Sequence, residues 1–120
     1  MCLRESGEMY LETVLELSKN GARVRSLDVA GHLGFSKPSV SRAMGKLKTE
    51  NYIMIDPQGY ISLTERGEGI ARKIYEKRLV LKELIMSIGV DEETAAKDSC
   101  RIEHVLSDET FEALKRYRGQ

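Results

Sequence analysis

The sequence predicts a mainly α-helical fold, a winged helix-turn-helix with a two-stranded wing followed by a helical module. Three features of the 120 residues predict it. Two short amphipathic segments flank Gly34, two β-prone runs flank a turn sequence at 56–59, and a helical pattern extends over 64–89. We expect two domains, residues 1–72 and 73–120, with their boundary inside that long helix.

The helix-turn-helix occupies residues 26–48. Gly34 ends its first helix, because glycine adopts the left-handed conformation at a helix C-terminus at low cost. Ser36 caps the second helix, and Pro38 fits the first turn, where its missing N–H costs nothing. Both helices carry apolar residues at helical spacing: Leu27, Ala30 and Leu33 in the first, and Val40, Ala43, Met44 and Leu47 in the second.

The other face of the second helix is short and basic, and it is a candidate DNA-binding surface. Small hydroxyls can approach phosphates or base edges there, and cations can reach them. An ordinary solvated surface helix has the same pattern, so this face alone does not decide between the two interpretations. The polar residues of the face are Lys37, Ser39, Ser41, Arg42, Lys46 and Lys48.

A β-hairpin follows and favours the DNA-binding interpretation. Residues 52–55 and 60–63 are rich in β-branched and aromatic side chains, and 56–59 is a turn sequence with proline and glycine. Helix, turn, helix and hairpin in this order form a winged helix. The tip of the wing, near Gln58, is then placed to touch the sugar-phosphate backbone.

The charge balance requires that any DNA affinity be local. Lysine and arginine number 19, aspartate and glutamate also number 19, and the net charge is zero. A nucleic-acid-binding domain is more often basic overall. Between Lys37 and Glu50, however, four cations face one acid, which leaves this segment with a net charge of +3.

The composition indicates where in the cell the protein is found. We expect a soluble protein with no membrane span and no secretory signal, because no apolar run approaches about 20 residues. The two cysteines, Cys2 and Cys100, do not form a disulfide framework. The expected location is therefore the cytoplasm, where both thiols are reduced.

Two further helices suggest how the chain assembles. Residues 5–19 form a first helix that closes at a glycine, and the helix over 64–89 is too long for a wing domain alone. An apolar stripe of that length needs a partner. A second copy of the chain is the simplest partner, so we expect a homodimer.

The segment 91–107 carries a candidate metal site. Cys100, Glu103 and His104 are three and four residues apart, so one helix face presents a thiolate, a carboxylate and an imidazole to a transition metal. Each residue alone has an ordinary alternative: a buried cysteine, an exposed glutamate or a structural histidine. Cys100 with His104 could also be a nucleophile and base, or Cys100 a redox sensor, but no orienting group or resolving cysteine accompanies them. We therefore expect neither an enzyme nor a small-molecule substrate.

Four local motifs resemble the diphtheria-toxin-repressor family of metal-dependent regulators, which has iron and manganese types. The motifs are EMYL at 8–11, SKPSVS at 36–41, LTERG at 63–67 and CRIEHVLS at 100–107. The resemblance extends over nearly the whole chain and implies a short form without the family's SH3-like third domain. It therefore implies a winged helix-turn-helix followed by a dimerisation and metal-binding module.

The resemblance also implies functional residues. Met9, Cys100, Glu103 and His104 fall on the ligands of the principal metal site in iron-type members, and Glu12 matches a ligand of manganese-type members. Sulfur and imidazole donors favour Fe(II), with Co(II), Ni(II) or Zn(II) as surrogates, over Mn(II), which prefers oxygen. The predicted DNA-binding residues, which include the family's DNA-facing positions, are Ser36, Lys37, Pro38, Ser39, Ser41, Arg42, Lys46 and Gln58.

The sequence departs from the family at a second metal site. Arg78 and Lys82 stand where a histidine and a glutamate are usual, and Ala96 replaces another histidine. Cations do not bind a cation, so we expect this site to be lost. Our hypothesis is that Arg78 pairs with Glu12 or a neighbouring acid as a fixed charge; the alternative is that Arg78 points to solvent.

The resulting expectation is a homodimeric repressor of a palindromic DNA operator. Metal binding would link the first helix to the Cys100 helix and so fix the pose of the DNA-binding domain. Two recognition helices of a two-fold dimer would read half-sites about one helical turn, or a multiple of it, apart. The alternative is a winged-helix regulator whose metal control has been lost or replaced by the charge of Arg78.

Overall fold

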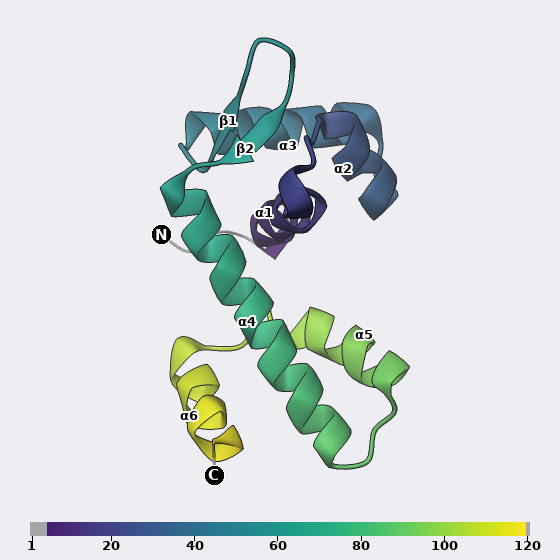
Figure 1. The fold of residues 1–120 in the computed structure, drawn as a ribbon, viewed down its shortest axis with the longest axis vertical. Coiled ribbons are helices and arrows are strands. Elements are labelled where there is room, and N and C mark those ends of the chain that lie inside the picture. The colour runs from purple at the N-terminus through teal and green to yellow at the C-terminus, as the bar shows by residue number, and fades with distance from the viewer. Residues whose placement is uncertain (1–4, 120) are drawn as a thin grey trace. The chain divides into compact units, whose positions relative to one another are not determined.

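The structure, a computed structural model, describes residues 5–119 (Figure 1). It confirms the mainly α-helical class and the two-stranded wing. The chain divides into two compact units, residues 1–72 and 73–120, with the division inside α4. Its elements are α1 (Glu5–Leu17), η1 (Lys19–Gly21), α2 (Ser26–Leu33), α3 (Lys37–Thr49), β1 (Ile53–Ile55), β2 (Ile61–Leu63), α4 (Glu65–Ser87), α5 (Glu92–Ile102) and α6 (Asp108–Arg118).

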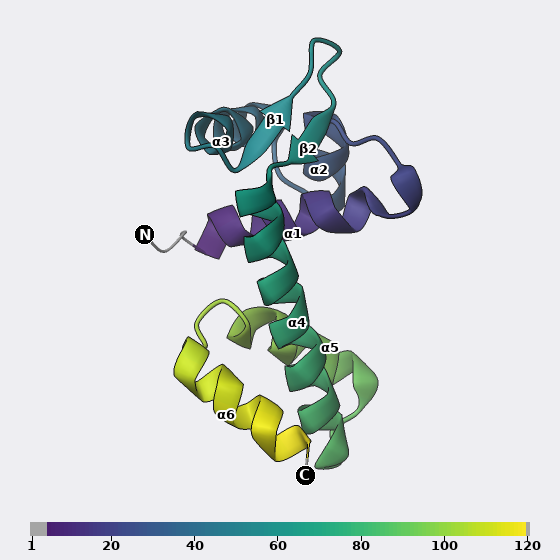
Figure 2. The same cartoon turned by 60° about the vertical axis from the view of Figure 1, so that its left-hand side comes forward.

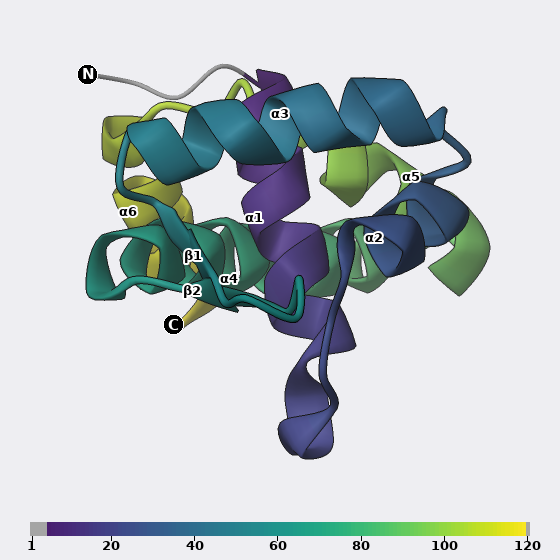
Figure 3. The ribbon, with the colours of Figure 1, turned by 90° about the horizontal axis from the view of Figure 1, so that it is seen from above.

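The turn between α2 and α3 forms as predicted. Gly34 has a φ of 72°, and its N–H donates to the Ala30 carbonyl at 2.8 Å. The Ser36 hydroxyl accepts the Ser39 N–H at 3.3 Å and so caps α3. Figure 3 shows α2 and α3 joined at one end by this turn. The sequence thus encodes the helix-turn-helix through one left-handed glycine and one capping serine.

The apolar stripe predicted for α2 is partly wrong. Leu27 is 57% exposed, whereas Val29 is fully buried. Because α2 begins at Ser26, Leu27 lies in its first turn, and Val29 takes the core position beside Ala30. The stripe predicted for α3 is confirmed, because the core of this unit contains Val40, Met44 and Leu47.

The wing is a tight antiparallel hairpin, and Figure 2 shows its loop projecting beyond β1 and β2. The register pairs Ile53 with Leu63 and Ile55 with Ile61. Gly59 turns the loop with a φ of 88° and donates its N–H to the Asp56 carbonyl at 2.9 Å. The segment before α2 adds a third, short strand-like pairing, because the Ile61 N–H donates to the Val24 carbonyl at 2.7 Å.

The first turn of α4 is fastened to the residues that precede β1. The Thr64 hydroxyl donates to the Asn51 carbonyl at 2.8 Å. Arg66 donates to the Tyr52 hydroxyl at 2.7 Å and lies 4.2 Å from the centroid of that ring. A side chain at Gly67 would overlap the Tyr52 carbonyl oxygen. The LTERG motif therefore has a structural role, which is to fix where α4 leaves the wing.

The second unit consists of the rest of α4 with α5 and α6. Its buried residues include Val80, Leu81, Ala95 and Phe111. Ion pairs join α4 to α6: Lys73 to Asp108 at 2.8 Å, Lys115 to Glu76 at 2.6 Å, and Arg118 to Glu83 at 3.0 Å. None of the described helices is long and apolar enough to cross a membrane.

The helix predicted over 91–107 ends earlier than expected. Asp91 caps α5 by accepting the Thr94 N–H at 3.1 Å, but α5 stops at Ile102. The Val105 and Leu106 N–H groups then both donate to the Ile102 carbonyl, which turns the chain. Ser107 caps α6 directly afterwards, so the helix cannot continue to that residue.

Candidate DNA-binding surface and metal centre

The predicted recognition residues lie at the solvent-facing side of α3. All are exposed except Ser39, which is half-buried; the exposed residues are Ser36, Lys37, Pro38, Ser41, Arg42, Lys46 and, on the wing, Gln58. Ser36 donates to the Ser39 hydroxyl at 2.8 Å, and Arg42 donates to the same hydroxyl at 3.4 Å. The Arg42 guanidinium is thereby held near the first turn of α3, the part of a recognition helix that reaches base edges.

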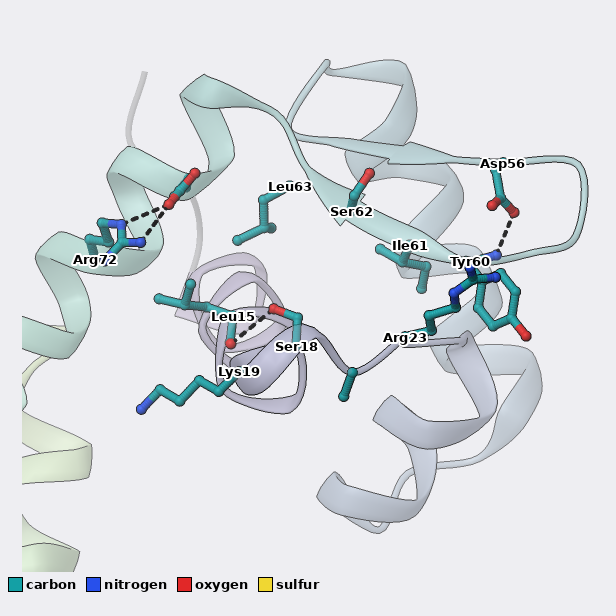
Figure 4. A pocket seen from close by; sticks show the side chains of 12 residues that line it. Leu15, Ser18, Lys19, Arg23, Asp56, Tyr60, Ile61, Ser62, Leu63 and Arg72 are labelled. Atoms are coloured by element: carbon teal, nitrogen blue, oxygen red, sulfur yellow. Dashed lines mark hydrogen bonds and ion pairs between the residues drawn. The ribbon is translucent and has the colours of Figure 1, made fainter.

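A second basic group, which was not predicted from the sequence, lies at the base of the wing. The Arg23 and Arg25 guanidiniums lie 5.1 and 4.5 Å from the centroid of the Tyr60 ring. Figure 4 shows Arg23 beside Tyr60 at the edge of a cleft of about 530 Å³, which Lys19 and Arg72 also line. Two arginines on either side of an apolar residue, Val24, could have indicated from the sequence that both side chains lie on one face of an extended segment. Their contact with Tyr60 could not be predicted, because it depends on the bridge between Val24 and Ile61.

The candidate metal ligands of the second unit form a buried charged cluster. Glu103 is fully buried, and the His104 side chain is only 5% exposed. The His104 Nε2 lies 3.3 Å from one Glu103 carboxylate oxygen, and the Arg78 Nε lies 3.2 Å from the other. A fully buried carboxylate is costly unless cations face it, so this site is built for positive charge.

The other three predicted ligands have different surroundings. Cys100 is exposed and lies one helical turn before Glu103, whose N–H still donates to the Ser99 carbonyl at 3.0 Å. Glu103 and His104 follow the end of α5, so the three residues do not share one continuous helix as expected. Met9 and Glu12 lie on α1 of the first unit, where Met9 is half-buried and Glu12 is 6% exposed.

The donors of this cluster fit one divalent transition metal. A carboxylate and an imidazole in contact are ligands that such ions take, and a thiol lies one turn away. Arg78 has a side chain 24% exposed and already meets one oxygen of Glu103. The prediction that Arg78 pairs with an acid is therefore confirmed for Glu103, and the alternative of an Arg78 pointing to solvent is wrong. Pairing with Glu12 stays a prediction.

Family models match both parts of the chain. The model described as the iron-dependent repressor N-terminal DNA-binding domain matches residues 2–61, and the model of its metal-binding and dimerisation domain matches 64–120. The chain belongs to the iron-dependent repressor family. This is a family of metal-dependent transcriptional regulators with a winged-helix fold.

Two transcriptional regulators are similar to this chain over most of its length. An uncharacterised HTH-type transcriptional regulator of Methanocaldococcus jannaschii is 34% identical over 115 residues, which are 94% of this chain and 92% of that protein. The transcriptional regulator MntR of Escherichia coli is 30% identical over 114 residues, 95% and 74% of the two chains. These relatives are transcriptional regulators, not enzymes.

A solved structure extends the likeness to the fold. The manganese regulator SloR superposes with a TM-score of 0.83 at 25% identity, covering 99% of this chain and 55% of that one. The chain thus spans about half the length of SloR. The resemblance expected from the four motifs is confirmed, and the choice of metal stays a prediction.

Proposed function

We propose that this chain is a homodimeric, metal-dependent repressor that binds a palindromic operator in double-stranded DNA in the cytoplasm. The observation that carries the proposal is the pairing of two features in one chain. One is an exposed basic helix in a helix-turn-helix, with Arg42 held by Ser39. The other is a buried carboxylate and imidazole, Glu103 and His104, 3.3 Å apart. Family membership supports joining them in one regulatory mechanism.

In this proposal Cys100, Glu103 and His104 hold one divalent metal together with Met9 and Glu12 of α1. The support is donor chemistry: one imidazole, carboxylates, a thiol and a thioether suit a borderline ion such as Fe(II) better than Mn(II). When bound, the metal supplies one positive charge centre that ligands from both units share. His104 and Glu103 orient one another. Because α1 belongs to the DNA-binding unit, ligands on α1 would connect the metal directly to that unit.

The dimer gives the operator its symmetry. Leu79 and Met86, seven residues apart on α4 of the second unit, are exposed apolar side chains on one side of the helix. We propose a second copy of the chain as the partner of α4. Two observations support this: the long apolar pattern of α4, and the match of this unit to the family's dimerisation domain. Two α3 helices related by a two-fold axis would then contact equivalent half-sites.

A second candidate is favoured by one contact. Arg78 already supplies a permanent positive charge to Glu103, at 3.2 Å. A chain with such a fixed charge could hold its DNA-binding form without an ion. This regulator would be a winged-helix protein whose metal control has been replaced by Arg78.

Calorimetric titration with Co(II) separates the two candidates. The proposal predicts one ion per chain, loss of binding in His104→Ala, and unchanged binding in His32→Ala, the matched control on α2. Arg78→His with Lys82→Glu should restore a second ion. Absence of Co(II) and Fe(II) binding would favour the fixed-charge candidate, and two ions in the unaltered chain would show that Arg78 does not replace the second ion.

A further inference from the structure

The two arginines at the base of the wing differ from Arg66 and Arg72 in their contacts. Arg66 binds Tyr52, and Arg72 pairs with Glu68 at 2.6 Å. Among the side chains that the structure describes, residues 7–119, neither Arg23 nor Arg25 forms an ion pair with an acid. Both are exposed, and both lie within 6 Å of one aromatic ring, that of Tyr60.

The backbone fixes where these two side chains point. Val24, between them, is buried and pairs with Ile61 of β2. Because successive side chains of an extended segment alternate, Arg23 and Arg25 both lie on the face opposite Val24, beside Tyr60. The Arg25 N–H also donates to the Asp28 carboxylate at 2.9 Å, which ties the segment to the start of α2.

With Arg23 and Arg25 included, cations outnumber acids in this part of the first unit. Lys19 and Arg72 line the same cleft. The nearby acids are engaged: Asp56 accepts the Gln58 and Tyr60 N–H groups at 3.0 and 2.8 Å, and Glu68 pairs with Arg72. Tyr60 belongs to the wing hairpin, and its ring orders two exposed arginines beside it. Such a cationic pair is complementary to a polyanion.

We propose that Arg23 and Arg25, ordered on Tyr60, bind phosphates of the DNA backbone as a second contact beside α3. This inference rests on the proposed DNA-binding function. Arginine suits the contact because its planar guanidinium presents several donors to phosphate oxygens. Such contacts position the protein and read no sequence, so the pair strengthens binding to every duplex alike.

The salt dependence of binding to a mixed-sequence duplex of about 30 base pairs tests the pair. Fluorescence anisotropy of the Co(II)-loaded protein between roughly 50 and 200 mM salt gives the slope of log affinity against log salt. The slope is negative, and each phosphate contact contributes about 0.9 to its magnitude. Arg23→Met with Arg25→Met should therefore reduce the magnitude of the slope by about 1.8, and each single change by about 0.9. Arg116→Met, which changes an exposed arginine on α6 of the second unit, is the matched control, with an unchanged slope.

The role of the ring has its own readout. Tyr60→Phe keeps the aromatic face and should bind as the unaltered chain does, whereas Tyr60→Leu should weaken binding to all duplexes. An unchanged slope in the folded double variant overturns the inference while leaving the proposed function intact. If the unaltered chain binds no duplex at any salt concentration, both the inference and the proposed function are wrong.

Discussion

Glu103 is a fully buried carboxylate between a permanent cation and an imidazole, and its surroundings decide how the site responds to metal. Arg78 lies 3.2 Å from one oxygen, and His104 lies 3.3 Å from the other. A buried charge without a partner is strongly destabilising, so Arg78 stabilises the metal-free unit. The same guanidinium repels an incoming cation. Arg78 should therefore raise the stability of the metal-free protein while weakening its affinity for metal.

The substitution Arg78→Met should change these two properties in opposite directions. We expect the free energy of unfolding of the metal-free protein to fall by about 2 kcal/mol. This is less than the roughly 3–5 kcal/mol expected when a fully buried ion pair is broken, because the Arg78 side chain is partly exposed to water. Co(II) affinity should rise by roughly tenfold, equivalent to about 1.4 kcal/mol of repulsion removed. Denaturant unfolding and calorimetry measure the two quantities.

The matched control is Lys82→Met, which removes another α4 cation, paired with the exposed Glu92 at 3.3 Å. It should change neither quantity appreciably, because exposed pairs contribute little. A loss of Co(II) affinity in Arg78→Met would contradict the role we give to Arg78.

Residue-level contacts were the least predictable part of the chain. The sequence placed acids near Arg78 but could not select Glu103, because the choice depends on α5 ending at Ile102. The pairing of Arg23 and Arg25 with Tyr60 likewise depends on a single bridge between distant residues. Capping residues were predictable, since Ser36 and Gly34 act through neighbours in the chain.

At the scale of elements, α4 makes fixing contacts at its first turn and near its middle. Its first turn approaches the backbone at Tyr52 so closely that only glycine fits at position 67. Lys73 and Lys77 meet Asp108, the first residue of α6, further along. Helix and strand locations followed from periodicity and turn residues, whereas the burial of Val29 in place of Leu27 depended on where α2 meets the core.

Gly67→Ala should destabilise the first unit by about 1–3 kcal/mol or more, because the added methyl overlaps the Tyr52 carbonyl oxygen and backbone must move. Gly69→Ala, where a methyl meets open space in the same helix, is the control and should stabilise by about 0.5–1 kcal/mol. Urea unfolding compares the two. Equal stability of Gly67→Ala and the unaltered chain would show that α4 is not held as closely as described.

The Asp108 contact predicts a dependence on pH. The hydrogen bond from Lys73 holds the pKa of Asp108 below its ordinary value of 3.8, and Lys77 adds to this. A carboxyl with a lowered pKa stabilises the fold above pH 3.8, and that contribution is lost as the pH falls through its folded pKa.

Thermal unfolding of Asp108→Asn should therefore show a lower Tm than the unaltered chain near neutral pH. The difference should shrink as the pH falls below 3.8. Asp98→Asn on the exposed side of α5 is the control. A Tm difference for Asp108→Asn that is constant across this range would mean that the ion pairs to α4 do not stabilise α6.

At the scale of the whole molecule, we propose that one unit contacts DNA and that residues of both units bind metal. Overall charge is zero, so we expect DNA affinity to arise from local groups on α3 and at the wing base. The family supports both functions in one chain, and the coupling between them is the central claim. The sequence predicted the two functions through motifs of a few residues, but a motif carries no information about coupling strength.

The most direct measurement of that coupling is the affinity for a duplex selected from a random library, with Co(II) or Fe(II) and with EDTA. We predict at least roughly tenfold weaker binding in EDTA, equivalent to about 1.4 kcal/mol of coupling. His104→Ala should bind weakly in both conditions. Arg42→Ala should lose about 1–3 kcal/mol with metal present while keeping its Co(II) affinity. If the unaltered chain binds the selected duplex equally well with metal and with EDTA, metal does not control its DNA binding.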